Sequence, residues 1–186
     1  VDWKEPVVQG SISESGDNLT AEVEPDDKDG SALLKIALPE IEGDNNDGRV
    51  WLQPQCPDPG EAAIDLFLSI YYADSGRKKN GPVLDDSGEE IIDESLLELA
   101  AEPGFQLLFG GEDCLEANEE GFLLVEWEYA DDYDDDYDIA DFDLELFARQ
   151  CRNNKTPQNP FPDGEVCIEG KDISWVAFCP EDPGAD

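Results

Sequence analysis

One segment, residues 139–162 (IADFDLELFARQCRNNKTPQNPFP), most constrains the fold of this chain. Over residues 142–146 apolar side chains alternate with acidic ones, which is the period of a β-strand that buries one face. The alternation breaks at Phe147 and Ala148. Cys151 follows, before a basic, Asn-rich turn. The segment therefore predicts a sandwich strand with a disulfide at its end.

Acidic charge dominates the composition. The 186 residues include 48 Asp and Glu against 11 Lys and Arg, so the formal net charge is -37. On the roughly 9,000 Å² that a folded chain of this size exposes, net charges lie about 15 Å apart. The screening length falls to about 3 Å only in molar salt. Because the charge is spread along the chain, it favours adaptation to high salt over a disordered acidic tail, and it excludes nucleic acid and anionic membranes as partners.

Missing residue types narrow the class of protein further. The chain has no histidine, which removes imidazole metal sites and His-based catalytic dyads. The acids are so many that no carboxylate pair stands out as catalytic. We therefore expect no enzyme. No run approaches the roughly 20 apolar residues of a membrane span, so we expect no membrane insertion. The lack of methionine indicates a processed chain or part of a longer one.

Five cysteines, none in a Cys-x-x-Cys pair, predict disulfides and an oxidising compartment. Cys167 and Cys179 bracket the last strand-like segment and are the first expected pair. Cys114 and Cys151 are the next. Cys56 would then be free or would form an intermolecular disulfide.

Short apolar segments separated by turn signals predict an all-β fold. The expected strands are residues 1–8, 19–23, 32–38, 49–53, 64–72, 105–109, 121–129, the first half of 139–162, and 172–179. Residues 95–101 are the one expected helix, with Ser95 and Glu98 as a capping box. These elements predict a single antiparallel β-sandwich over residues 1–180 and a flexible tail at 181–186.

Two kinds of surface site are candidates. Asn18 and Asn154 begin glycosylation sequons. The acidic run 131–138 is a candidate calcium loop, because Ca²⁺ takes six to eight oxygen ligands. The carboxylates concerned are Asp131, Asp132, Asp134, Asp135 and Asp136. The alternative is a solvated, salt-tolerant loop. The loop after residue 72 carries Arg77, Lys78 and Lys79 in its middle, so we expect no calcium there.

The sequence of the segment at residues 139–162 resembles a known family. FDLELFARQCRNN (residues 142–154) followed by NPF is similar to the last conserved strand of the TasA/camelysin family, with Asn153 where the family has histidine. Haloarchaeal members carry SipW-type signal peptides. GFLLVEWEY (121–129) and ALLKIAL…VWL (32–52) are also family-like. The resemblance implies a jelly-roll sandwich that is secreted through a signal peptide.

The resemblance also implies a function. TasA-like proteins form extracellular filaments, in which the N-terminal strand of one subunit completes the sheet of the next. Here that strand would be the segment with Val1, Trp3, Val7 and Val8, and the partner would be another copy of the chain. Pairing of this segment with its own domain is the alternative for these residues. The alternative function is a monomeric cell-surface domain that binds cations or carbohydrate.

Overall fold

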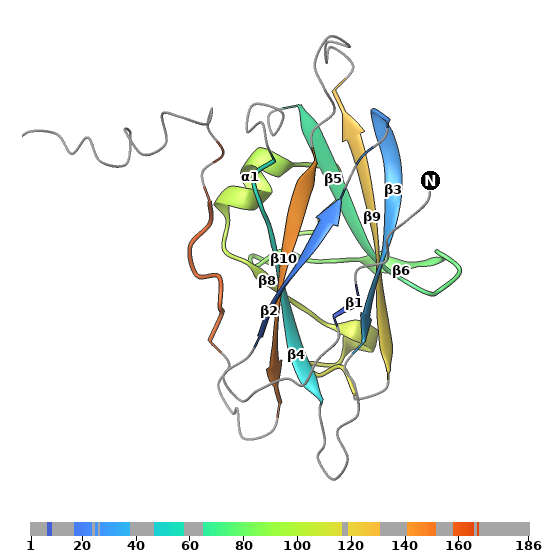
Figure 1. Ribbon diagram of the computed structural model, residues 1–186, viewed down its shortest axis with the longest axis vertical. Coiled ribbons are helices and arrows are strands. Elements are labelled where there is room, and N and C mark those ends of the chain that lie inside the picture. Colours follow the sequence, from blue (N-terminus) through green and yellow to red (C-terminus); the bar gives the residue numbers. More distant parts are fainter. Residues whose placement is uncertain are drawn as a thin grey trace, which may run out of the picture.

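The computed structural model arranges the chain in two stacked β-sheets (Figure 1). It describes residues 7–8, 17–23, 25, 27–37, 47–57, 65–116, 119–130, 141–151, 158–165 and 167. The expected strand at 172–179 and the expected tail at 181–186 lie outside these residues.

Sheet A has the strand order β1-β3-β9-β5-β6, with β7 also paired to β5. Its strands are β1 (Val7–Val8), β3 (Asp29–Ala37), β5 (Leu66–Ala73), β6 (Lys79–Pro82), β7 (Glu94–Ser95) and β9 (Glu120–Tyr129). Sheet B has the order β2-β10-β4-β8. Its strands are β2 (Asp17–Val23), β4 (Gly48–Pro54), β8 (Phe105–Leu107) and β10 (Phe142–Gln150). Among the described strands, β1 with β3 is the one parallel pair, and the other pairs are antiparallel.

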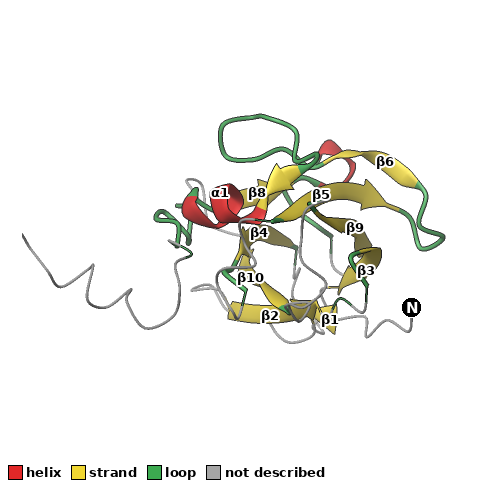
Figure 2. Cartoon of the chain, turned by 90° about the horizontal axis from the view of Figure 1, so that it is seen from above, coloured by secondary structure: helices red, strands yellow, loops and turns green. Residues whose placement is uncertain are grey.

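From β2 to β5, successive strands alternate between the two sheets. β2 pairs with β10 in sheet B, and β3 pairs with β9 in sheet A, as in a double-sheet jelly roll. The predicted all-β sandwich with one short helix is confirmed. Seen from above, β1 and β2 lie at one lateral edge of the sandwich, and β6 and β8 lie at the opposite edge (Figure 2).

The core lies between the sheets and uses the inward members of each alternating strand. In β3 and β9, Leu34 lies opposite Leu123 and Ala32 opposite Val125, and all four are fully buried. Two short strands, β6 and β7, were not expected, because charged and turn-forming residues dominate that part of the sequence.

The outer face of sheet B is covered by the chain, which explains the break in alternation at Phe147 and Ala148. Ala148 belongs to the core, whereas Phe147 lies on the opposite face and is also buried. The Phe147 ring lies 6.1 Å from Trp51 and 6.5 Å from Phe161, between ring centroids. The strand continues to Gln150. Loss of alternation therefore marks a strand that is buried on both faces.

We call residues 158–165 and 167 the C-terminal cover. Asn159 Nδ2 donates to the Gly104 carbonyl (2.6 Å), and the Gly104 amide donates to the Phe161 carbonyl (2.9 Å). The Phe161 amide donates back to Asn159 Oδ1 (2.9 Å). A Cβ at Gly104 would lie 2.7 Å from the Phe161 side chain, so the close approach requires glycine. The Asn-Pro-Phe-Pro sequence is thus a docked segment.

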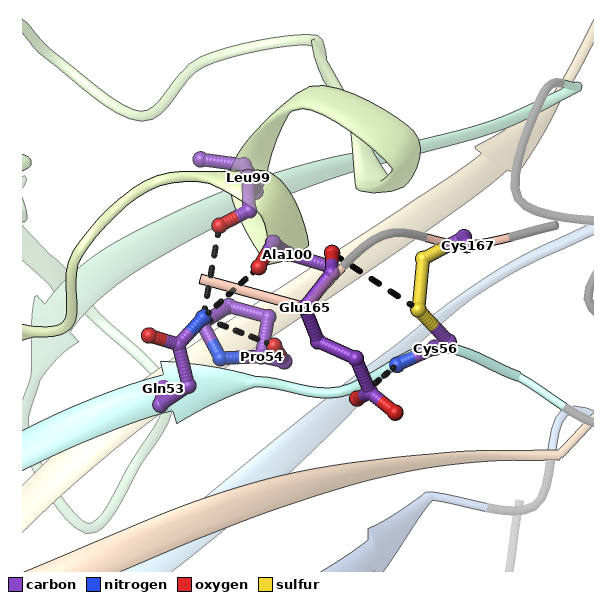
Figure 3. Close-up of a disulfide and its surroundings, with 7 residues drawn as sticks. All are labelled: Gln53, Pro54, Cys56, Leu99, Ala100, Glu165 and Cys167. Carbon is purple, nitrogen blue, oxygen red and sulfur yellow. Dashed lines mark hydrogen bonds between the residues drawn. A yellow bond between two sulfur atoms is a disulfide. The ribbon is translucent and has the colours of Figure 1, made fainter. Parts of the chain in front are cut away.

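The predicted helix is present as α1 (Leu96–Ala101), but its predicted capping box is not formed. Ser95 makes no side-chain capping hydrogen bond to the helix, because it is the last residue of β7 and pairs with Phe67 of β5. At the other end of α1, the buried amide of Gln53 donates to the carbonyls of Ala100 (3.3 Å) and Leu99 (3.5 Å) (Figure 3). This side chain ties the helix to β4.

The first expected disulfide is wrong. Cys167 is bonded to Cys56, with 5.2 Å between their Cα atoms, and not to Cys179 (Figure 3). The physical reason is the docking of the cover, because the Glu165 amide donates to the Ala100 carbonyl (2.6 Å) and carries Cys167 to the end of β4. Cys56 is therefore neither free nor intermolecular.

The second expected disulfide, Cys114–Cys151, is confirmed. It joins the segment before β9 to the end of β10, where the Cys151 amide also donates to the Asp47 carbonyl (2.8 Å). Four of the five cysteines are thus paired, which leaves Cys179 without a cysteine partner in its own chain.

Candidate assembly surfaces

The N-terminal edge of sheet A holds the described part of the expected assembly segment. Val7 pairs with Lys35 and Val8 with Ile36, in parallel register. These two residues therefore pair with their own domain, which is the alternative that the sequence left open. Val1 and Trp3 lie outside the described residues. β1 covers two positions of the nine-residue strand β3. Over residues 29–34, the described part of the chain supplies β3 with a strand neighbour on its β9 side alone.

The opposite edge of the sandwich is hollowed by a groove of about 1,000 Å³ between β6 and the segment after β8. Its apolar walls include Leu84 and Leu108, which are 44% and 38% exposed and are thus two of the most exposed large apolar residues described. The floor includes Tyr72 and Phe109, whose rings meet edge to face at 5.5 Å. We call this feature the β6–β8 groove.

A hydrogen bond between the two sheets fixes the floor of the β6–β8 groove. The Leu108 amide donates to Tyr72 Oη at 2.7 Å. Burial raises the pKa of the Tyr72 hydroxyl, and the bond from Leu108 opposes that rise in part. The phenol therefore stays neutral at physiological pH, and the groove presents a preformed apolar floor.

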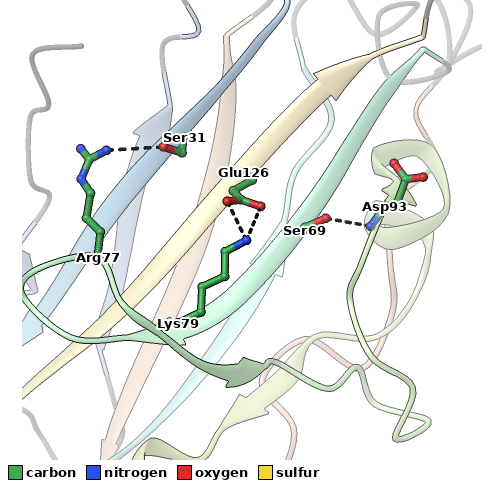
Figure 4. Close-up of polar contacts among 6 residues, drawn as sticks. All are labelled: Ser31, Ser69, Arg77, Lys79, Asp93 and Glu126. Carbon is green, nitrogen blue, oxygen red and sulfur yellow. Dashed lines mark hydrogen bonds and ion pairs between the residues drawn. The ribbon is translucent and has the colours of Figure 1, made fainter.

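The outer face of sheet A carries a polar row across three strands. Ser31 of β3 and Ser69 of β5 both lie directly opposite Glu126 of β9. The hairpin formed by β5 and β6 spans this row (Figure 4): Arg77 Nη1 donates to Ser31 Oγ at 3.4 Å, and Lys79 Nζ lies 2.9 Å from a Glu126 carboxylate oxygen. The Glu126 carboxylate raises the pKa of Lys79, chiefly through this hydrogen bond.

A shallow polar basin of about 350 Å³ lies along the same row. Ser31, Ser69 and Glu126 line it together with Phe67 and Asp93. The Asp93 amide donates to Ser69 Oγ at 2.8 Å, and Asp93 has a positive φ of 55°. Because residues other than glycine rarely adopt this conformation, the backbone here is strained. The basin offers hydroxyls and carboxylates beside two aromatic side chains, Phe67 and Trp127.

Carboxylates crowd the connection from β6 through β7 to α1. Partial burial, followed by repulsion from nearby acids, raises the pKa of Glu94 and of Glu102. The neighbours that contribute to both shifts are Asp85, Glu89 and Glu98. This part of the molecule therefore carries unrelieved negative charge at neutral pH.

The candidate calcium residues, Asp131, Asp132, Asp134, Asp135 and Asp136, lie outside the described residues. Within the described part, no group of three or more Asp, Glu, Cys or His could hold a metal ion. In the loop with the three consecutive cations, Asp74 Oδ1 accepts hydrogen bonds from the amides of Gly76 and Lys78, both at 2.9 Å. The Asp74 carboxylate thus stabilises the turn in which it lies.

Of the two asparagines that begin glycosylation sequons, the structure describes the backbone of the first and not the second. Asn18 belongs to β2, at the edge of sheet B, and its Cα pairs with that of Phe147. Asn154 lies outside the described residues. Glycan occupancy at both positions stays a prediction.

Comparison with models of protein families, with curated proteins and with solved structures finds no match to this chain. The two disulfides indicate an oxidising, extracellular environment. Among the described residues, no helix has the length and apolar character needed to cross a membrane.

Proposed function

We propose that this chain is a secreted structural subunit, exported with a signal peptide, that assembles head-to-tail into an extracellular filament or matrix adapted to high salt. The observation that carries the proposal is the N-terminal edge. A two-residue strand pairs there with β3, a nine-residue strand with room for a longer partner. The family-like sequence FDLELFARQCRNN supports the same function.

Strand exchange is the proposed route of assembly. The N-terminal segment of one copy leaves its own β3 and pairs with β3 of the next copy, where residues 29–34 extend the available edge. The two residue pairs between β1 and β3 bind the N-terminal segment only weakly, because parallel pairing is slightly less stable per residue than antiparallel pairing. A contact that repeats without closing generates a filament.

Charge also favours this route. At a net charge of -37, two copies that approach face to face repel each other. Main-chain hydrogen bonds and apolar burial do not depend on net charge, and strand addition uses both. Molar salt then screens the remaining repulsion.

The test is deletion of residues 1–8, together with any residues that precede them. We expect a soluble, folded monomer that forms no filaments under electron microscopy in molar salt. Val7→Asp with Val8→Asp should act in the same direction. Val7→Thr with Val8→Thr is the matched control, because it keeps the β-branched shape. Filaments of normal length from the deletion variant would contradict strand exchange.

A second candidate function is a monomeric cell-surface domain that binds carbohydrate, and the polar basin of sheet A supports it. Ser31, Ser69 and Glu126 offer hydrogen bonds to hydroxyl groups, and Phe67 offers a ring edge or face to a sugar. Binding of oligosaccharides to a strictly monomeric protein, lost in Ser69→Ala but kept in Ser75→Ala, would favour this function over assembly. Ser75 lies on the exposed turn between β5 and β6.

A further inference from the structure

The β6–β8 groove has the shape and chemistry of a site for an extended apolar segment. It lies between β6 of sheet A and the segment after β8 of sheet B. Leu84 and Leu108 expose apolar surface on its two walls. The Tyr72–Leu108 hydrogen bond holds the floor in place. An extended chain placed here meets the edge strands of both sheets.

The rim of the β6–β8 groove selects against acidic segments. Asp85, Asp86, Asp113 and Glu120 stand around the apolar walls. Their charges repel other carboxylates, and about a quarter of this chain's residues are acidic, 48 of 186. An occupant from this protein must therefore come from one of its few acid-free, apolar stretches.

Residues 173–179 (ISWVAFC) are such a stretch, and they lie outside the described residues. They carry no charged side chain and include two aromatic residues. Their pattern predicts a strand. The other stretches outside the described residues are short or rich in Asp, Glu, Gly and Pro. Among the stretches outside the described residues, this segment is thus the one that matches the groove in charge and apolar character.

The place where the described chain ends indicates which copy supplies the segment. Cys167 is held by Cys56. Leu107 of β8 lies next to the groove and pairs with Val50 of β4. Cys56 lies six residues after Val50 in the chain. At about 3.3 Å per residue, Cys56 is therefore about 20 Å along the chain direction from the groove end of β4. The C-terminal cover runs from Gly104 towards Ala100, away from the groove. The tail therefore starts at the far end of β4 from its own groove.

We propose that residues 173–179 of one copy occupy the β6–β8 groove of the next copy. This inference rests on the proposed self-assembly and adds a second contact to it. The segment leaves one end of the sandwich and enters a groove near the other end. The contact is consequently heterologous and does not close, which suits a filament.

Cys179 supplies a chemical probe, since the four other cysteines are paired. Ser87→Cys places a thiol on the groove, and Ser75→Cys places one on an exposed turn outside it. The full chain is oxidised in molar salt and run on a non-reducing gel. We expect a ladder of covalent multimers from Ser87→Cys, at least fivefold more than from Ser75→Cys. Adding Cys179→Ser should abolish the ladder.

Two results of this experiment would overturn the inference. An intrachain disulfide between residues 87 and 179 in a monomer means that the tail fills its own groove. Equal cross-linking of Ser87→Cys and Ser75→Cys means that the groove is not the site.

A groove variant separates this inference from the proposed function. Leu108→Glu puts a carboxylate on the apolar wall, and Ile92→Glu is its control, because Ile92 is 41% exposed but does not line the groove. We expect Leu108→Glu to raise the concentration needed for assembly at least tenfold and Ile92→Glu to leave it unchanged. Normal filaments from Leu108→Glu would overturn the groove contact and leave self-assembly standing. A wild-type chain that stays monomeric, with no cross-links, would remove both.

Discussion

Two segments lie over the outer faces of the sandwich, and they are held by different forces. The C-terminal cover lies on sheet B and is fixed by backbone hydrogen bonds, the Phe147–Phe161 contact and the Cys56–Cys167 disulfide. The β5–β6 hairpin belongs to sheet A by backbone pairing, and it contacts the outer face of that sheet through two cationic side chains, Arg77 and Lys79. The first segment is therefore part of the folded core, whereas the contacts of the second with the outer face depend on salt and pH.

Loss of the Cys56–Cys167 disulfide should have the largest effect. The bond closes a loop of 111 residues, against 37 for Cys114–Cys151. Loop entropy then gives about 4.7 kcal/mol for the first and about 1 kcal/mol less for the second. Chemical denaturation of Cys56→Ala with Cys167→Ala, beside Cys114→Ala with Cys151→Ala, measures both. A larger loss from the second pair would contradict the view that the cover is part of the core.

Phe147→Ala should destabilise the fold by about 3 kcal/mol, because it removes the buried ring between Trp51 and Phe161. Tyr71→Ala is its counterpart under the hairpin, where Lys79 Nζ lies 4.0 Å from the Tyr71 ring centroid. Since Tyr71 is only half-buried, its loss should cost about 1 kcal/mol. Equal losses of unfolding free energy would remove the distinction between the two faces.

Acidification and salt should both stabilise the protein. The folded pKa of Glu94 and of Glu102 lies above the ordinary value of 4.5. Their contribution to stability is thus full at low pH and is lost as pH rises through the folded pKa. The melting temperature should rise as the pH is lowered from 7 towards the ordinary Glu pKa of 4.5 in dilute buffer. It should also rise between dilute and molar salt at pH 7, since salt screens the same repulsion. A melting temperature that stays flat or falls with salt would contradict adaptation to brine.

Lys79→Gln should have the smallest effect. The pair with Glu126 is at the surface, and such pairs contribute about 0.2–1 kcal/mol. Because the folded pKa of Lys79 is raised, the pair stabilises the fold below the ordinary Lys pKa and is lost as pH rises through the higher folded value. Lys78→Gln, next to it on an exposed position, is the control. A difference between the two variants that persists unchanged in molar salt would show that packing, not charge, holds the hairpin.

Local pattern was enough to predict most of the sandwich. Short apolar segments bounded by turn signals placed β3, β5, β9 and β10 to within a few residues, because each buries at least one face against the core. The break at Phe147 was visible in the sequence, but its cause was not, since Trp51 and Phe161 reach it from distant parts of the chain. The resemblance at residues 142–154 covers this doubly buried strand.

Features set by distant contacts were missed for the same reason. Cys167 pairs with Cys56 because the cover docks on Gly104 and Ala100, which no spacing of cysteines reveals. Ser95 and Glu98 have the spacing of a capping box, yet the backbone of Ser95 pairs with Phe67 of β5 instead. The β6–β8 groove joins residues from four separate stretches, and none of these carries a recognisable motif.

Sedimentation velocity of the full chain in molar salt, over a wide range of protein concentration, tests self-assembly most directly. We expect a distribution of species that shifts to larger sizes as concentration rises, without a stop at a dimer or a closed ring. A single species of 20.5 kDa at every concentration would contradict it.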